Sequence, residues 1–174
     1  MIHEVHPWMI TLNFDQKILS FDDGLQTQFE MISKFPINNK KILFPIVGFI
    51  NDKNLNKNLV SCREALRKAY CGNTEHYLNF KQLDFLINSG IEIGGHSFSH
   101  RDIRQMTFIE SVEYLKKDTE QMFIFFEKYK ININFFCFPF NYDSIVYRTI
   151  VKQYNPNIIF FDKYRKPIEE LKDK

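Results

Sequence analysis

Two features are missing from this sequence, a strong excess of one charge and a long apolar run, and each absence restricts the partners of the protein. Lys and Arg number 23 and Asp and Glu number 21, which leaves a net charge of +2 over 174 residues. Because no basic stripe stands out, we do not expect nucleic acid as the main partner. No segment reaches the roughly 18 apolar residues of a membrane helix, so we expect no membrane span. This balance suits a neutral or zwitterionic small substrate.

The N-terminal residues do not have the pattern of an export signal. His3, Glu4 and His6 lie where a signal peptide would carry a positively charged region followed by an apolar run. The sequence also contains no internal repeat and no linker rich in Pro, Gly or Ser, so one domain over residues 1–174 fits its length. We therefore expect a single-domain protein of the cytoplasm.

Cysteine is scarce, and its spacing is irregular. The sequence holds three cysteines: Cys62, Cys71 and Cys137. An odd number without a repeated CxxC spacing does not indicate a disulfide framework. Cys62, Cys71 and the nearby His76 are an alternative metal cluster, but their spacing matches no common zinc motif and we do not favour it.

What the sequence does contain is a regular alternation of strand and helix patterns. Short apolar runs predict strands over residues 17–21, 41–50, 91–93, 133–138 and 158–161. Helical spacing predicts helices over residues 25–35, 59–70, 79–90, 107–130 and 144–154. This order predicts an α/β fold with a parallel sheet and right-handed crossovers, either open and doubly wound or closed as a barrel.

Local signals refine this pattern at three places. Asn79 with Gln82, and Thr107 with Glu110, are each spaced as a helix-capping box. Pro45 lies inside the second predicted strand, where it cannot donate a backbone hydrogen bond. We therefore expect an edge position or a bulge there.

Polar side chains follow several of the predicted strands. They are Asp22, Asp23, His96, His100 and Asn141. In both versions of the fold, chemistry collects at the carboxyl ends of the strands. We therefore expect these side chains to converge on one side of the sheet.

The adjacent carboxylates Asp22 and Asp23 repel each other, and their burial costs solvation unless a cation lies between or beside them. Neighbouring residues on an extended chain point to opposite sides, so the two should differ in role. One can bind a metal while the other acts as a base. The alternative is a simple strand-to-helix turn, in which an Asp caps the helix and Gly24 supplies the tight conformation.

His96 and His100 are four residues apart, just after a predicted strand and Gly94-Gly95. If this segment turns helically, both imidazoles face one ion. The alternative is two surface histidines in a loop. Together with one Asp, they form a facial set that leaves positions open for water and substrate, as in catalytic metal sites. The remaining Asp can take the proton of the water.

The segment ending in Phe138-Pro139-Phe140 closes the fourth predicted strand. Pro139 restricts the backbone and can aim the Phe140 amide outward. A fixed N–H near a metal is a candidate oxyanion donor. The alternative is a core strand that ends in a Pro turn.

The ordered motifs resemble the polysaccharide deacetylases with the NodB homology domain, carbohydrate esterase family 4. The resemblance rests on Ser20-Phe21-Asp22-Asp23-Gly24, His96-Ser97-Phe98-Ser99-His100 and Cys137-Phe138-Pro139-Phe140. The run 86–95 also resembles the family's lead-in to its His motif, and the whole resemblance covers about residues 17–142. It implies a distorted (β/α) barrel, here incomplete because only about five strands are clear.

The resemblance also implies roles for the individual residues. Asp22 would be the general base, and Asp23, His96 and His100 the ligands of a divalent metal, Zn²⁺ first, with Co²⁺, Ni²⁺ or Fe²⁺ as alternatives. The backbone N–H of Phe140 would stabilise the oxyanion. Water would attack an N-acyl carbonyl, leaving a free amine on the sugar and acetate or a related short acid.

The chain departs from the family pattern in two ways. Cys137 stands where the best-known members have an Arg that orients the base, and Phe140 replaces a Tyr. No His follows Asn141, although family members often end with a His that acts as general acid. Some exopolysaccharide deacetylases resemble the family in circularly permuted form, so we expect His6, or less favourably His3, to supply this acid from a strand within residues 1–10.

We therefore predict a metal-dependent N-deacetylase of an amino sugar that is free, nucleotide-linked, lipid-linked or oligomeric, and a part in making surface polysaccharide. A deformylase of a formamido sugar is a close variant. A metal-binding or sugar-binding protein that lost catalysis is the alternative from another class, favoured by the missing Arg and opposed by the intact Asp22. An exposed barrel edge would leave room for a homo-oligomer.

Overall fold

The computed structural model describes residues 18–32, 40–52 and 60–161. Strands and helices alternate along these segments, as predicted. They are β1 (Ile18–Asp23), α1 (Gln26–Ile32), β2 (Lys40–Pro45), the 3₁₀ turn η2 (Val47–Phe49), α2 (Cys62–Tyr70), α3 (Phe80–Asn88), β3 (Glu92–Ile93), α4 (Phe108–Lys128), β4 (Phe135–Cys137), the 3₁₀ turn η3 (Pro139–Asn141), α5 (Ile145–Tyr154) and β5 (Ile159–Phe161). The strand expected within residues 1–10 lies outside the described residues.

The strands form one parallel array in chain order. β1 pairs with β2 and β2 with β3 in one sheet, and β4 pairs with β5 in another. Gly95 joins the two sheets, because its N–H donates to the Phe135 carbonyl at 2.8 Å and its carbonyl accepts the Cys137 N–H at 2.9 Å. No pairing joins β5 to β1 within the described residues, so the array is α/β and parallel but not a closed barrel there.

The array is curled, with one face turned inward. Alternate residues of β2, β4 and β5 form the inner cluster of Ile42, Phe44, Cys137 and Phe161. The rings of Phe44 and Phe161 lie 5.4 Å apart between centroids, although β3 and β4 separate their strands in the array. The inner face must therefore be strongly concave, and it leads to the carboxyl ends of the strands.

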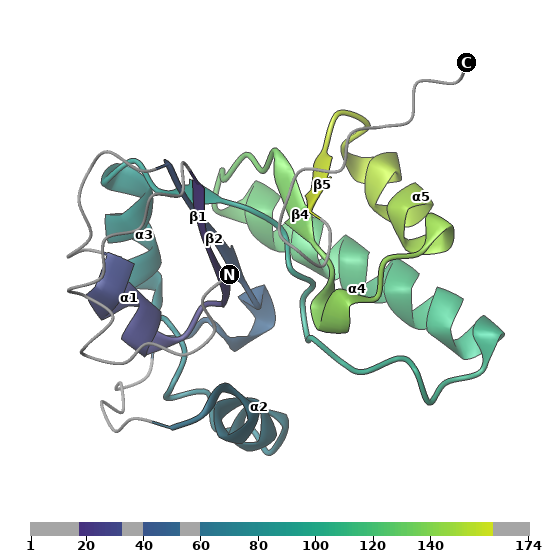
Figure 1. Ribbon diagram of the computed structural model, residues 1–174, viewed down its shortest axis with the longest axis horizontal. Helices are drawn as coiled ribbons and strands as arrows, with labels where there is room; N and C mark the ends of the chain where they lie inside the picture. Colours follow the sequence, from purple (N-terminus) through teal and green to yellow (C-terminus); the bar gives the residue numbers. More distant parts are fainter. Residues whose placement is uncertain (1–17, 33–39, 53–59, 162–174) are drawn as a thin grey trace.

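Helices α1, α3, α4 and α5 cover the outer face. Leu19, Phe21, Leu43, Phe136 and Phe160 point to this side and belong to the main core. In Figure 1, α1 and α3 lie beside β1 and β2, while α4 and α5 lie beside β4 and β5 at the other end of the array. No helix in the described part of the chain is long and apolar enough to cross a membrane.

Both predicted capping boxes are confirmed. Asn79 accepts the backbone N–H of Gln82, and the Gln82 side chain accepts the N–H of Asn79 at the start of α3. Thr107 and Glu110 make the same reciprocal pair at the start of α4. Each box satisfies two N–H groups that the first turn leaves without a partner inside the helix, so it defines where the helix begins.

The prediction of an edge strand or a bulge at Pro45 is wrong. β2 lies between β1 and β3, and Pro45 is its last residue, opposite Asp23 of β1. β3 pairs only with Ile42 and Leu43, so its hydrogen bonds end before Pro45. A proline is tolerated at this position because no neighbour on that side requires its missing N–H.

Gly94 and Gly95 allow close packing of the segment that leads to the His motif. A Cβ atom on Gly94 would lie 2.3 Å from the ring of Phe44, and one on Gly95 would lie 2.8 Å from the ring of Phe136. Both rings are fully buried. The two glycines therefore let the backbone pass close to these aromatic side chains as it leaves β3 toward the His motif.

Candidate functional site

Four of the residues predicted from the sequence lie together at the carboxyl ends of β1 and β3. The Nε2 atoms of His96 and His100 are 3.3 and 3.4 Å from Oδ1 of Asp23. Nε2 of His96 is 3.9 Å from Oδ2 of Asp22. None of the four residues is more than 6% exposed. Two carboxylates and two imidazoles thus share one buried volume.

The turn after β1 gives the two carboxylates their positions. Asp22 continues the inner face of the strand, whereas Asp23 and Gly24 have φ values of 78° and 77°. A Cβ on Gly24 would lie 2.8 Å from Cβ of Pro45, so only glycine fits there. Gln28 is fully buried, and its side-chain oxygen accepts the N–H of Gly24 and that of Leu25, each at 3.1 Å. This side chain holds the turn, and the sequence carried no signal for it.

The loop that carries the histidines is held from α4 by Asp118. This buried carboxylate accepts the N–H of Phe98 and the N–H of Ser99, both at 2.9 Å. It also accepts the hydroxyl of Ser99 at 2.6 Å and that of Tyr114 at 2.9 Å. Sequence reasoning missed Asp118, because it lies about 20 residues away, in the middle of a helix.

Backbone strain is concentrated at this site. The described non-glycine residues with positive φ are Asp23, Ser97, His100, Lys130, Phe140 and Asn141. All but Lys130 belong to the motifs after β1, β3 and β4. Left-handed backbone costs about 1–2 kcal/mol per L-residue, so the surrounding contacts must impose it.

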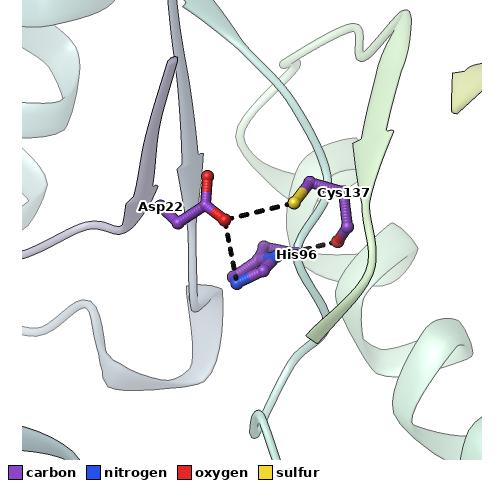
Figure 2. A group of neighbouring side chains, drawn as sticks. All are labelled: Asp22, His96 and Cys137. Carbon is purple, nitrogen blue, oxygen red and sulfur yellow. Dashed lines mark hydrogen bonds and ion pairs between the residues drawn. The ribbon is translucent and has the colours of Figure 1, made fainter. Parts of the chain in front are cut away.

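His96 is oriented by the backbone of β4. Its Nδ1 lies 2.7 Å from the Cys137 carbonyl, so Nδ1 carries the hydrogen and donates it. Nε2 then points to Oδ2 of Asp22 (Figure 2) and lies 3.3 Å from Oδ1 of Asp23. This Nε2 atom is buried and has no aligned hydrogen-bond partner within the described residues. A lone pair directed at a carboxylate is unfavourable, unless a cation or a proton lies between them.

The two imidazoles differ in their affinity for protons. Burial opposes the charged form of His96, but the close approach of Asp23 and the charge of Asp22 raise its pKa overall. Burial and the nearby His96 lower the pKa of His100 to about 4. The site therefore favours positive charge between the imidazoles and the carboxylates, but not on both rings.

The donor set fits a divalent metal. Asp23, His96 and His100 each offer one ligand atom, and the three atoms lie within 4.8 Å of one another. Two imidazole nitrogens and one carboxylate oxygen are common ligands of catalytic Zn²⁺, which keeps a further position open. The buried Nε2 of His96 is a donor atom that such an ion would satisfy.

Cys137 lies next to Asp22. Its Sγ lies 3.2 Å from Oδ2 of Asp22, and the thiol donates to this carboxylate (Figure 2). The sequence left open how Asp22 is oriented without the family's Arg. In the structure, a neutral thiol on β4 makes that contact. Asp22, His96 and Cys137 also each have one potential ligand atom within 4.8 Å of the other two, so they form a second possible group of metal ligands.

The alternative cluster of Cys62, Cys71 and His76 is not formed among the described residues. Cys71 is exposed at the end of α2, and the His76 ring nitrogen Nε2 lies 3.1 Å from Nζ of Lys68. Cys62 instead donates to Oδ2 of Asp23 at 2.8 Å. These residues are close in the sequence but point in different directions, because they lie at opposite ends of α2 and in the loop after it.

Phe140 and Asn141 lie in η3, at the rim of the site. The Phe140 ring is 4.6 Å from that of His100 between centroids, and the Arg104 guanidinium lies over the Phe140 ring, 5.4 Å from its centroid. Asn141 is exposed. Of the third motif, Phe140 is therefore the residue that contacts the site. Asn141 was expected to converge on the site as well, but it only lies next to Phe140.

A groove of about 510 Å³ lies between the loop after His100 and α4. Charged side chains dominate its walls, among them Arg101, Asp102, Glu113 and Lys117. Arg101 directly follows His100 in the chain.

No protein-family model and no curated protein sequence matches this chain, but several solved structures do. IcaB from Ammonifex degensii matches with a TM-score of 0.58 and 14% identity over 83% of this chain and 58% of its own. A de-N-acetylase from Aggregatibacter actinomycetemcomitans matches with a TM-score of 0.62 and 15% identity over 98% and 75%. BC0361, a polysaccharide deacetylase from Bacillus cereus, matches with a TM-score of 0.54 and 15% identity over 82% and 38%.

These matches establish the fold. The chain has the fold of the polysaccharide deacetylases, as its motifs predicted. It spans 58% of the IcaB chain and 38% of BC0361, so it corresponds to only part of these proteins. At this level of identity, activity has to be argued from the site itself.

We predict that Asp118→Asn weakens the binding of Zn²⁺ by about 10- to 100-fold, the usual effect of losing an outer contact to a metal site. The substitution replaces one acceptor oxygen by an NH₂ group, which cannot accept the N–H and O–H hydrogens of Phe98 and Ser99. The loop that carries His96 and His100 would then be held less firmly. Competition with a chelator measures the affinity. Asp84→Asn on the exposed side of α3 is the matched control, and equal affinities for the two folded variants would contradict the role of Asp118.

Proposed function

We propose that this protein is a metal-dependent hydrolase that removes an N-acyl group, acetyl in the first place, from an amino sugar. One observation supports this function best. At the strand ends, Asp22 and Asp23 lie close to His96 and His100, and all four side chains are buried. The same arrangement has one carboxylate among the metal donors and one beside them. A site that only binds metal would not need the second carboxylate.

Each residue has a distinct task in this proposal. Asp23, His96 and His100 hold the divalent metal, with Zn²⁺ preferred and Co²⁺, Ni²⁺ or Fe²⁺ as alternatives, and this ion supplies Lewis acidity toward water and the acyl carbonyl. Asp22 accepts the proton of the attacking water. The Phe140 N–H donates to the oxyanion that develops on the carbonyl oxygen.

The general acid is assigned to His6. An amide nitrogen leaves only when it is protonated, so hydrolysis needs a donor on the leaving-group side. His3 and His6 both lie outside the described residues. We assign the task to His6 from the sequence, because some exopolysaccharide deacetylases that the chain resembles carry their acid His near the N-terminus.

The curled array of β1 to β5 supports a distorted, incomplete (β/α) barrel. The groove between the loop after His100 and α4 suits a polar substrate such as a sugar, whether free, nucleotide-linked, lipid-linked or part of an oligomer. A role in surface polysaccharide synthesis, a location in the cytoplasm and homo-oligomer formation remain predictions. A formamido sugar would use the same chemistry.

One observation favours a second candidate, a member of this fold that binds metal or sugar without hydrolysis. Cys137 is a neutral and weaker hydrogen-bond donor to Asp22 than the charged Arg found in the best-known members. The base would then be less firmly oriented. Activity measurements separate this candidate from the hydrolase.

We expect the parent protein to bind one divalent metal per chain and to release acetate from N-acetylated sugars, free or nucleotide-linked. Asp22→Asn should retain the metal and lose about 100-fold or more in rate, because general-base catalysis contributes about that much. Metal analysis and an acetate assay are run on the same preparations, with Asp84→Asn as a control for the change in charge. Metal in both proteins but acetate from neither would support the binding protein instead.

His6→Ala should lower the rate of acetate release while leaving metal binding unchanged. The reason is that an acid assists departure of the amine but contributes no ligand to the metal. His3→Ala is the matched control, with a smaller expected effect. Turnover of His6→Ala equal to that of the parent would remove His6 from the mechanism.

A further inference from the structure

We propose that Cys62 is a positioning residue for the metal-facing carboxylate, and that α2 acts through it as a clamp on the metal ligands. This inference rests on the proposed function. Sγ of Cys62 lies 2.8 Å from Oδ2 of Asp23, while the other oxygen, Oδ1, faces His96 and His100. One oxygen is thus held by the thiol, and the other is directed to the place where the metal would lie.

The start of α2 sets the position of the thiol. Ser61 caps the helix by accepting the N–H of Glu64, and Cys62 is the first residue of the helix. Ala65 and Ala69 on the following turns are buried, and they belong to a hydrophobic cluster that is separate from the main core. This packing orients the first turn, so Cys62 reaches Asp23 from an ordered helix although 39 residues separate them in the chain.

The other end of α2 contacts a second ligand residue. Tyr70, the last residue of the helix, donates its hydroxyl hydrogen to the backbone carbonyl of His100. The backbone carbonyl can only accept, so the tyrosine hydroxyl, which is protonated at neutral pH, is the donor. The two ends of one helix therefore restrain Asp23 and His100 at the same time.

A thiol has an advantage over a charged donor at this position. A guanidinium or ammonium beside Asp23 would neutralise the carboxylate and repel the metal ion. A neutral S–H orients the carboxylate while leaving its negative charge available to the cation. Cys137 makes the same kind of contact with Asp22. Each carboxylate of the pair is thus held by its own cysteine, from a different element.

The test compares two substitutions of Cys62 with a control just after the end of the same helix. Cys62→Ala removes the donor and should raise the Kd for Zn²⁺ by about 10- to 100-fold, whereas Cys62→Ser keeps a donor and should stay within about threefold of the parent. Cys71→Ala, at the exposed end of α2, should leave the Kd unchanged. Unchanged melting temperatures show that each variant is folded.

The absorption spectrum of the Co²⁺-loaded protein separates a hydrogen-bond donor from a ligand. We expect no sulfur-to-cobalt charge-transfer band in the parent, because the thiol bonds to Asp23 and not to the metal. A charge-transfer band that disappears in Cys62→Ala would make Cys62 a ligand and overturn its positioning role. Equal Kd values for the parent and Cys62→Ala would also overturn it while leaving the proposed function intact. A parent that binds no metal would overturn both.

Discussion

The burial of two adjacent carboxylates determines which groups must surround them. Asp22 and Asp23 end β1 with almost no exposure to solvent. Two negative charges at this distance are costly in a medium of low dielectric constant unless positive charge or hydrogen-bond donors compensate them. The neighbours supply both, with imidazoles at 3.3–3.9 Å and a thiol on each carboxylate. The arrangement is what a cation site requires.

The surrounding fold keeps this arrangement in place. The strands are parallel and curled, so their carboxyl ends lie close together and the motifs after β1, β3 and β4 meet. Left-handed backbone at Asp23, Ser97, His100 and Phe140 costs energy that Gln28, Asp118 and α2 help to offset. These supports come from helices, whereas the groups that carry the chemistry come from strand ends and loops.

The features of the fold and the site that depend on local sequence signals could be predicted. The features that depend on contacts between distant segments could not. Apolar runs, helical spacing and capping boxes are local signals, so the order of elements and the meeting of the Asp and His motifs followed from them. Pro45 was misread, because its tolerance depends on where β3 stops pairing. Asp118, Gln28 and Cys62 act through contacts made only in the folded chain, and no local pattern marks them. Cys137 was noticed as a departure, but its contact with Asp22 required the structure.

The most direct test of the account is X-ray absorption spectroscopy at the zinc edge of the zinc-loaded protein. In our proposal, Asp23, His96 and His100 bind the metal while Cys62 and Cys137 hold the carboxylates. This proposal predicts a first shell of nitrogen and oxygen at about 2.0–2.2 Å, with the outer scattering of two imidazoles and no sulfur. A sulfur shell near about 2.3 Å, or the absence of imidazole scattering, would contradict it.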